Sequence, residues 1–145
     1  MIFSELTGNV DVNGNNLELL TWDATHWSLL PYDFDTTVGL YNRIITTKDN
    51  SNPVLNYTFY NTFKACYETE IKQIYTHLRG THCLDIDVLY NTYISQVDAI
   101  PRYIYEQDIK NWPNTYWTNG FPVIEQIYFY LQSRLEYLDS IWLNS

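Results

Sequence analysis

Basic residues are scarce in this sequence. Lys and Arg number 8 among 145 residues, against 17 Asp and Glu, which gives a formal net charge of −9. A nucleic-acid-binding module needs clustered Lys and Arg to displace counterions, and an anionic membrane surface attracts the same cations. The composition therefore argues against nucleic acid and membrane as partners. An anionic substrate such as a nucleotide would need a metal ion to mediate its binding.

Cysteines and long apolar runs are also few. Cys66 and Cys83 do not make a disulfide framework. The two could pair with each other, but we expect two buried thiols. Together with His77 and His82 they match no standard spacing of a zinc site. No apolar run approaches the ~18 residues of a membrane span, and the N-terminus lacks the basic and apolar regions of a signal peptide. These features do not identify the cellular compartment.

Aromatic residues, by contrast, are abundant. They make up 17% of the chain, with 14 Tyr and 5 Trp. Their rings can fill a core, but their OH and NH groups then need polar partners or water. A chain of this length is most simply one domain, residues 1–145, which can bury roughly 68–70% of its unfolded surface.

A β-hairpin is predicted near the N-terminus. Two short apolar runs, Leu17–Trp22 and His26–Leu30, flank the polar turn Asp23–Thr25, a pattern typical of paired strands. Pro31 is expected to end the second strand because proline cannot donate a ladder hydrogen bond. His26, in or beside the turn, is expected to be exposed.

Helical periodicity accounts for most of the remaining sequence. Met1–Gly8 has the pattern of the last two turns of a helix, so we expect an upstream segment. Residues 33–52 lack periodicity and are interpreted as an ordered loop with Gly39 as a hinge. The later apolar spacing predicts helices over 53–80, 85–100, 102–112 and 122–142. The predicted fold class is α+β, with one β-hairpin packed on three to four α-helices.

Two polar clusters flank the predicted hairpin. Asp11 and Asn16 lie five residues apart at its entry, and Asp33 and Asp35 lie at its exit. Hairpin closure would bring both clusters to one edge of the small sheet. The alternative is that these residues only build turns, which Asp and Asn do readily.

Phosphoryl transfer uses such residues. It needs a carboxylate to orient the attacking hydroxyl, and oxygen ligands that hold Mg²⁺ against the phosphates. Protein kinases place these groups in a loop with an Asp, an Asn five residues later, a hairpin and a second Asp. Carboxylate and amide oxygens suit Mg²⁺ or Mn²⁺ better than zinc.

Several segments carry a resemblance to a known family. They are Asn9-Val10-Asp11 with Asn16, the strand Leu17–Trp22, the stretch from Trp27 to Asp35 with Gly39, and the later Arg134-Leu135-Glu136-Tyr137-Leu138. Together they resemble the core of the spore-coat-protein-H-like (CotH) kinases. The resemblance covers nearly the whole chain and is most specific over residues 9–39. It implies a protein-kinase-like fold that transfers phosphate from ATP to Ser or Thr of a protein.

The resemblance also implies roles for four residues. Asp11 would be the catalytic aspartate. Asn16 and Asp33 would bind the Mg·ATP cofactor through the metal, with Mn²⁺ as a substitute ion, and Asp35 would be a second acidic metal ligand.

The chain departs from the family in one respect. The family places an N-terminal lobe before this core, with a Lys that holds the ATP phosphates, whereas this sequence has no glycine-rich phosphate loop and no Lys before Lys48. We therefore expect the C-terminal lobe alone. Either another chain supplies the missing lobe, or the sequence is a fragment, or the site is vestigial. The expected partners are a protein substrate or the chain that supplies the lobe. The competing hypothesis is a non-catalytic structural or interaction subunit, for instance of a coat or phage particle, built on the same scaffold.

Overall fold

The structure is a computed structural model that describes residues 1–9, 11–13, 15–33, 37–38, 40–41, 44–45, 53–113 and 121–144. Within these ranges the fold is α+β, as predicted. The elements follow in the order α1 (Ile2–Thr7), a 3-10 turn η1 (Asp11–Asn13), β1 (Leu17–Thr21), β2 (Trp27–Pro31), β3 (Leu40–Tyr41), β4 (Ile44–Ile45), α2 (Thr58–Cys66), α3 (Glu68–Gly80), α4 (Ile86–Asp98), α5 (Arg102–Asn111) and α6 (Phe121–Trp142).

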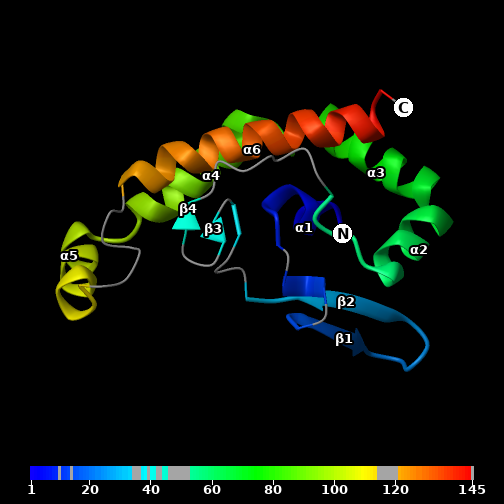
Figure 1. Cartoon of the computed structure of the whole chain (residues 1–145), viewed down its shortest axis with the longest axis horizontal. Coiled ribbons are helices and arrows are strands. Elements are labelled where there is room, and N and C mark those ends of the chain that lie inside the picture. Colours follow the sequence, from blue (N-terminus) through cyan, green and yellow to red (C-terminus); the bar gives the residue numbers. More distant parts are fainter. Residues whose placement is uncertain are drawn as a thin grey trace.

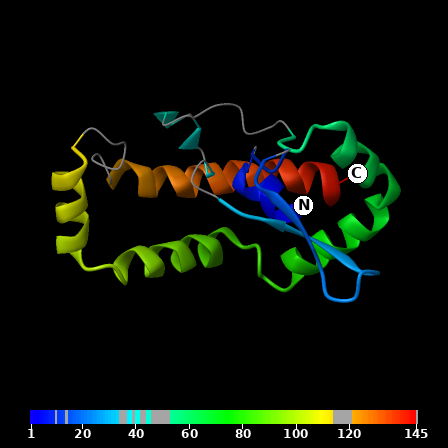
Figure 2. The same ribbon diagram turned by 90° about the horizontal axis from the view of Figure 1, so that it is seen from below.

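The long helix α6 is the main packing partner of the other helices. It runs along the longest dimension, and α1, α3 and α4 pack against it (Figure 1). Seen from below, α4 lies alongside α6 and α5 turns across its far end (Figure 2). Its inward face, predicted from the spacing of apolar residues, forms the main core with Leu6 of α1 and Tyr75 of α3; the buried members from α6 are Ile127, Tyr130, Leu131, Leu135, Leu138 and Trp142.

A buried ion pair fixes α1 to α6. The Arg134 Nη2 lies 3.0 Å from the Glu5 Oε2, and both side chains are almost fully buried. The Arg134 Nε donates to the Glu5 backbone carbonyl, at 2.9 Å. The Glu5 carboxylate also accepts hydrogen bonds from the backbone N–H groups of Val54 and Leu55, and the Lys64 Nζ lies 3.3 Å away. One carboxylate thus joins α1, α6 and the approach to α2.

A second polar cluster joins α3 to α6. The Arg79 guanidinium binds both oxygens of Asp139, at 3.0 and 2.8 Å, and the Tyr75 hydroxyl donates to the same carboxylate at 2.8 Å. Burial, followed by the hydrogen bond to Asp139, raises the pKa of Tyr75. The phenol therefore stays a neutral donor, and Arg79 also caps the turn after α3 by donating to the Leu84 carbonyl at 2.6 Å.

The N-terminal helix ends as the sequence predicted. Gly8 follows α1 with φ +71°, a left-handed conformation in which a glycine carries no steric cost. A methyl group at this position would overlap the Tyr130 hydroxyl. Tight packing therefore adds to the backbone requirement for glycine.

We expect Gly8→Ala to lower the free energy of unfolding by more than about 1 kcal/mol, because both φ and space are unsuitable for a side chain. Gly80→Ala is the matched control, since Gly80 is the last residue of α3 and has open space around its Cα. It should be neutral or slightly stabilising. Urea unfolding of both variants checks the pair, and equal stabilities would contradict the prediction.

The predicted hairpin is confirmed. β1 and β2 pair antiparallel with Leu17 opposite Pro31, Leu19 opposite Leu29 and Thr21 opposite Trp27. β2 ends at Pro31, and the His26 side chain at the turn is 90% exposed. The hairpin projects from the helical body beside η1 (Figure 1).

The helix predicted over residues 53–80 is wrong as a single element. The described chain breaks at Tyr67, whose φ −125° and ψ 26° separate α2 from α3. The apolar spacing that predicted this helix is confirmed only in part: Phe59, Cys66 and Ile74 are exposed. Leu55 is buried, and Phe63 and Leu78 are partly buried against the main core. Tyr60, Ile71 and Tyr75 are buried as well. The described part consequently has six α-helices rather than three or four.

Two further expectations need correction. Cys66 and Cys83 are free and exposed rather than buried, because Cys66 ends α2 at the break and Cys83 lies in the turn after α3. The segment interpreted as a loop contains the short strands β3 and β4, where Leu40 pairs with Ile45 and Tyr41 with Ile44. Aromatic and β-branched residues favour such pairing. Gly39, the predicted hinge, lies outside the described residues.

Candidate functional site at the hairpin edge

The entry to the hairpin is a compact turn built on Asn9 and Asp11. The fully buried Asn9 side chain accepts a hydrogen bond from the Asp11 N–H at 3.2 Å. The Asp11 carbonyl accepts in turn from the N–H groups of Asn15 and Asn16, at 3.2 and 3.1 Å. Asp11 and Asn16, five residues apart in the sequence, are therefore neighbours through the backbone.

The exit of the hairpin returns to the same place. The Tyr32 N–H donates to the Asn16 carbonyl at 3.1 Å, and the Tyr32 hydroxyl donates to the Asn15 carbonyl at 3.3 Å. Asp33 follows directly, with φ 57°. This left-handed conformation is uncommon for a residue with a side chain, although Asp adopts it more readily than most. Hairpin closure thus brings the segments that carry Asp11, Asn16 and Asp33 to one edge.

The helical body holds this edge in position. Val12 of η1 is buried against Leu55 and Tyr60, and the Tyr60 hydroxyl donates to the Val12 carbonyl at 2.9 Å. On the other side the Asn9 N–H donates to the Ser4 carbonyl of α1 at 3.0 Å. The backbone of Asp11 is consequently fixed from α1 and from α2.

The predicted residues offer hard oxygen donors. Asp33 is exposed, while Asp11 and Asn16 are half-buried; Asp35 lies outside the described residues. No group of three His, Cys, Asp or Glu suited to a metal is found in the described ranges. Within the described residues, the predicted metal ligands are the Asp33 carboxylate and the Asn16 amide oxygen, and Mg²⁺ commonly combines few protein ligands with several waters.

Comparison of the chain with protein-family models, with curated proteins and with solved structures finds no match. The resemblance to CotH kinases therefore stays a prediction, and the function is argued from the site. No helix within the described ranges has the length and apolarity to span a bilayer.

Asn9 is the main residue whose role the sequence did not reveal. Its oxygen orients the Asp11 backbone, and its Nδ2 is buried with no hydrogen-bond partner in the described part of the chain. The available signal was an Asn two residues before an Asp, the spacing of an Asx turn. Tyr32 was missed as well, because its contacts depend on the strand register.

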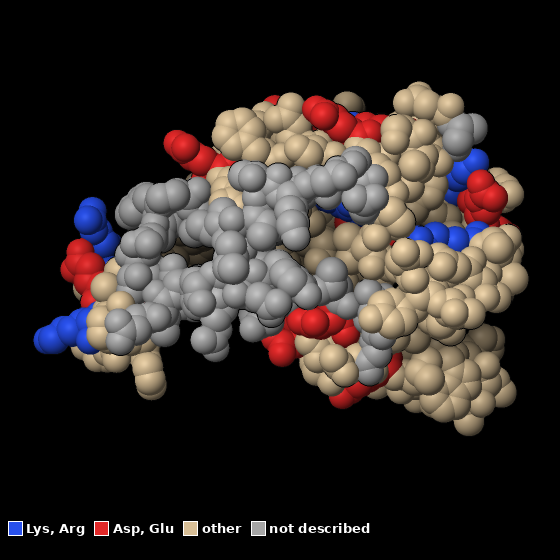
Figure 3. Space-filling model, viewed as in Figure 1, with Lys and Arg blue, Asp and Glu red and all other residues tan. Residues whose placement is uncertain are grey.

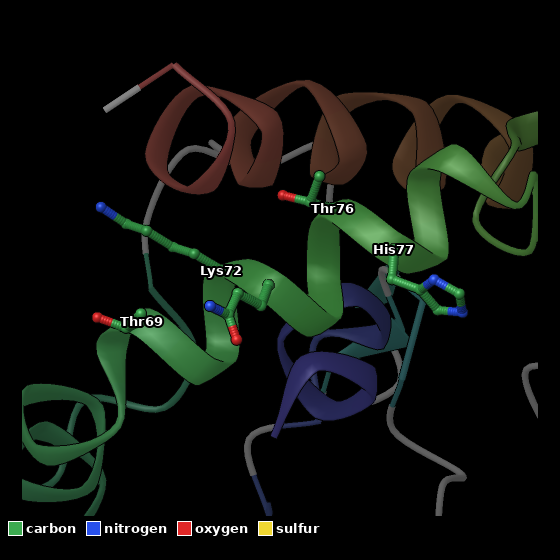
Figure 4. Close-up of a pocket in the computed structure, with 5 residues that line it drawn as sticks. Thr69, Lys72, Thr76 and His77 are labelled. Atoms are coloured by element: carbon green, nitrogen blue, oxygen red, sulfur yellow. The ribbon is translucent and has the colours of Figure 1, made fainter.

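A hollow on α3 shares no residue with the hairpin edge. Its volume is about 460 Å³, and it is lined by Thr69, Lys72, Gln73, Thr76 and His77. All five belong to one helix, and Lys72 and His77 extend in different directions from it (Figure 4). The Lys72 Nζ pairs with Glu68 at 3.0 Å. A ligand there would meet a single helix, so we assign no chemistry to it.

Proposed function

We propose that this chain carries the metal-binding and catalytic part of an ATP-dependent phosphotransferase that acts on protein hydroxyl groups. The support is the geometry at the hairpin edge. The Asp11 carbonyl binds the Asn16 N–H and the Asn16 carbonyl binds the Tyr32 N–H, both at 3.1 Å. These contacts join Asp11 to Asn16, and Asn16 to Tyr32, the residue directly before Asp33.

Each residue has a role that follows from its chemistry. Asp11, at a turn anchored on both sides, would orient the acceptor hydroxyl and receive its proton. The Asn16 amide oxygen and the Asp33 carboxylate would hold Mg²⁺, with Asp35 as a further carboxylate. The metal, when bound, neutralises charge on the transferring phosphate. A partner chain or further lobe would supply cations for the phosphates.

Binding of Mg·ATP tests the metal ligands. Calorimetric titration of the chain should give saturable heat, and Asp33→Asn should weaken the affinity at least tenfold because a carboxylate ligand is lost. Asp98→Asn is the matched control, since Asp98 is an exposed carboxylate at the end of α4 and its replacement changes the net charge equally. Equal affinities of the two variants, or no saturable heat with the unmodified chain, would contradict the proposal.

The competing function, a structural or interaction subunit, is favoured by a different observation. Large aromatic side chains are strongly exposed, among them Trp22 (87%), Tyr103 (69%) and Trp112 (62%). A subunit of a larger particle would cover such side chains. Under that function Mg·ATP would produce no saturable heat.

A further inference from the structure

The β1–β2 hairpin exposes an apolar face. Side chains opposite each other in the register share a face, which places Leu17, Leu19, Thr21, Trp27 and Leu29 together. Leu17 packs against the small core of Val12, Leu55 and Tyr60, but Leu19 is 62% exposed and Trp27 58%. The face therefore starts in the core and continues into solvent.

The turn of the hairpin is held by hydrogen bonds and carries a further exposed aromatic side chain, Trp22. The Asp23 Oδ1 accepts from the N–H groups of Thr25 and His26, at 2.9 and 2.7 Å, and the Ala24 N–H donates to the Thr21 hydroxyl. The hydrogen bonds from His26, followed by the one from Thr25, hold the pKa of Asp23 well below its ordinary value. Trp22 is thus exposed on an ordered turn, and ordering before binding lowers the entropy cost of association.

The charges around this face have one sign. Residues 1–42 contain no Lys or Arg, and the hairpin itself carries Glu18, Asp23 and Asp33. Figure 3 shows acidic and uncharged atoms over the hairpin at lower right, with no basic atoms there. Such a surface repels nucleic acid and anionic lipid, and it complements a surface with Lys or Arg around an apolar centre.

The exposed tryptophans supply a substantial part of the area that a specific contact needs. Covering Trp22 and Trp27 would bury on the order of 300 Å², since an aromatic side chain contributes roughly 150–250 Å² when buried. This is more than a third of the roughly 800 Å² that one partner contributes to a standard interface, and Leu19 and Leu29 enlarge it. Tryptophan is also among the residues that dominate binding energy in interfaces.

We propose that the projecting hairpin, with Leu19, Trp27 and Leu29 on one face and Trp22 at its turn, is a docking surface for a partner protein whose apolar side chains are flanked by Lys or Arg. The surface is separate from the phosphotransfer residues, so the interaction holds whether or not the chain is an enzyme. The partner's cations would lie beside Asp23 at the turn and could reach Glu18 around the edge of β1, while its apolar side chains would cover Leu19, Trp27 and Leu29.

Synthetic peptides serve as the probe. A twelve-residue peptide that alternates Lys with Leu should bind the full chain and change the fluorescence of the hairpin tryptophans, while the same peptide with Glu in place of Lys should not. The double variant Leu19→Thr/Trp27→Thr retains strand-forming residues and should weaken binding at least tenfold. The control variant Phe129→Ala/Tyr103→Ala removes equally exposed aromatics from helices and should bind like the unmodified chain. Circular dichroism establishes that each variant is folded.

Three outcomes would overturn the proposal. The first is equal binding of the Lys peptide by the hairpin variant and the control variant. The second is equal affinity of the unmodified chain for the Glu peptide and the Lys peptide. The third is a dimer of the unmodified chain in sedimentation, together with a monomer for the hairpin variant. In that case a second copy, and not a basic partner, covers the face.

Discussion

Arg134→Met is expected to lower the free energy of unfolding by about 3–5 kcal/mol, the range for breaking a buried ion pair by removing one partner. Methionine retains an unbranched apolar stem but lacks the guanidinium group, so the loss comes mainly from the charge left on Glu5 and from the Glu5 carbonyl that loses its Arg134 donor. The two backbone N–H groups and Lys64 that also contact Glu5 soften this loss. A change near the lower end of the range is therefore expected, and urea unfolding measures it.

The chain offers a matched control for this prediction. Arg102 forms an ion pair with Glu106 at 3.1 Å, but the two side chains are 82% and 63% exposed. An exposed pair contributes about 0–1 kcal/mol, so Arg102→Met should leave stability nearly unchanged. Similar unfolding curves for Arg134→Met and Arg102→Met would show that the Glu5 contact does not hold α1 to α6.

Periodicity and turn chemistry predicted much of this fold. The hairpin followed from two apolar runs around Asp23–Thr25, and α6 followed from its long apolar stripe. The break at Tyr67 could not be predicted, because aromatic residues continue at helical spacing through it. The ring centroids of Phe63 and Tyr67 lie 4.8 Å apart across the end of α2. The spacing of apolar residues indicates that a segment is helical, but it does not indicate where one helix ends and the next begins in a new direction.

Long-range polar contacts were the second limit. Glu5 and Arg134 are 129 positions apart, and nothing in either local sequence shows that they meet in the core. At the candidate site, the sequence supplied Asp11, Asn16 and Asp33 and the order in which they occur. The anchoring contacts of Asn9, Tyr32 and Tyr60 depend on tertiary packing and strand register, so only the structure reveals them.

The proposed chemistry predicts a large effect at Asp11. The Asp11→Asn change keeps the size of the side chain and leaves the backbone contacts to Asn9, Asn15 and Asn16 available. It removes the carboxylate that would accept the proton of the attacking hydroxyl. General-base catalysis contributes typically 10²- to 10⁴-fold, and phosphate transfer should fall by about that factor. Affinity for Mg·ATP should change little, because Asp11 is assigned to the acceptor and not to the metal.

The double variant Asp11→Ala/Asp33→Ala removes both proposed functions of the site. Its free energy of unfolding should fall by about 1 kcal/mol, because Asp33 has φ 57° and alanine adopts this left-handed conformation less readily than Asp. Asp98→Ala, which removes an exposed carboxylate far along the sequence, is the control for a general effect of charge.

The decisive measurement is the incorporation of radiolabelled γ-phosphate from Mg·ATP into a mixed Ser/Thr peptide library, with the chain assayed alone and with any partner that binds the hairpin. Incorporation by the unmodified chain and by Asp98→Ala, with at least a 100-fold loss in Asp11→Asn and none detected in the double variant, is the result we predict. Incorporation that is equal in all four proteins, or absent from the unmodified chain under both conditions, would contradict the assignment of the hairpin edge as a phosphotransfer site.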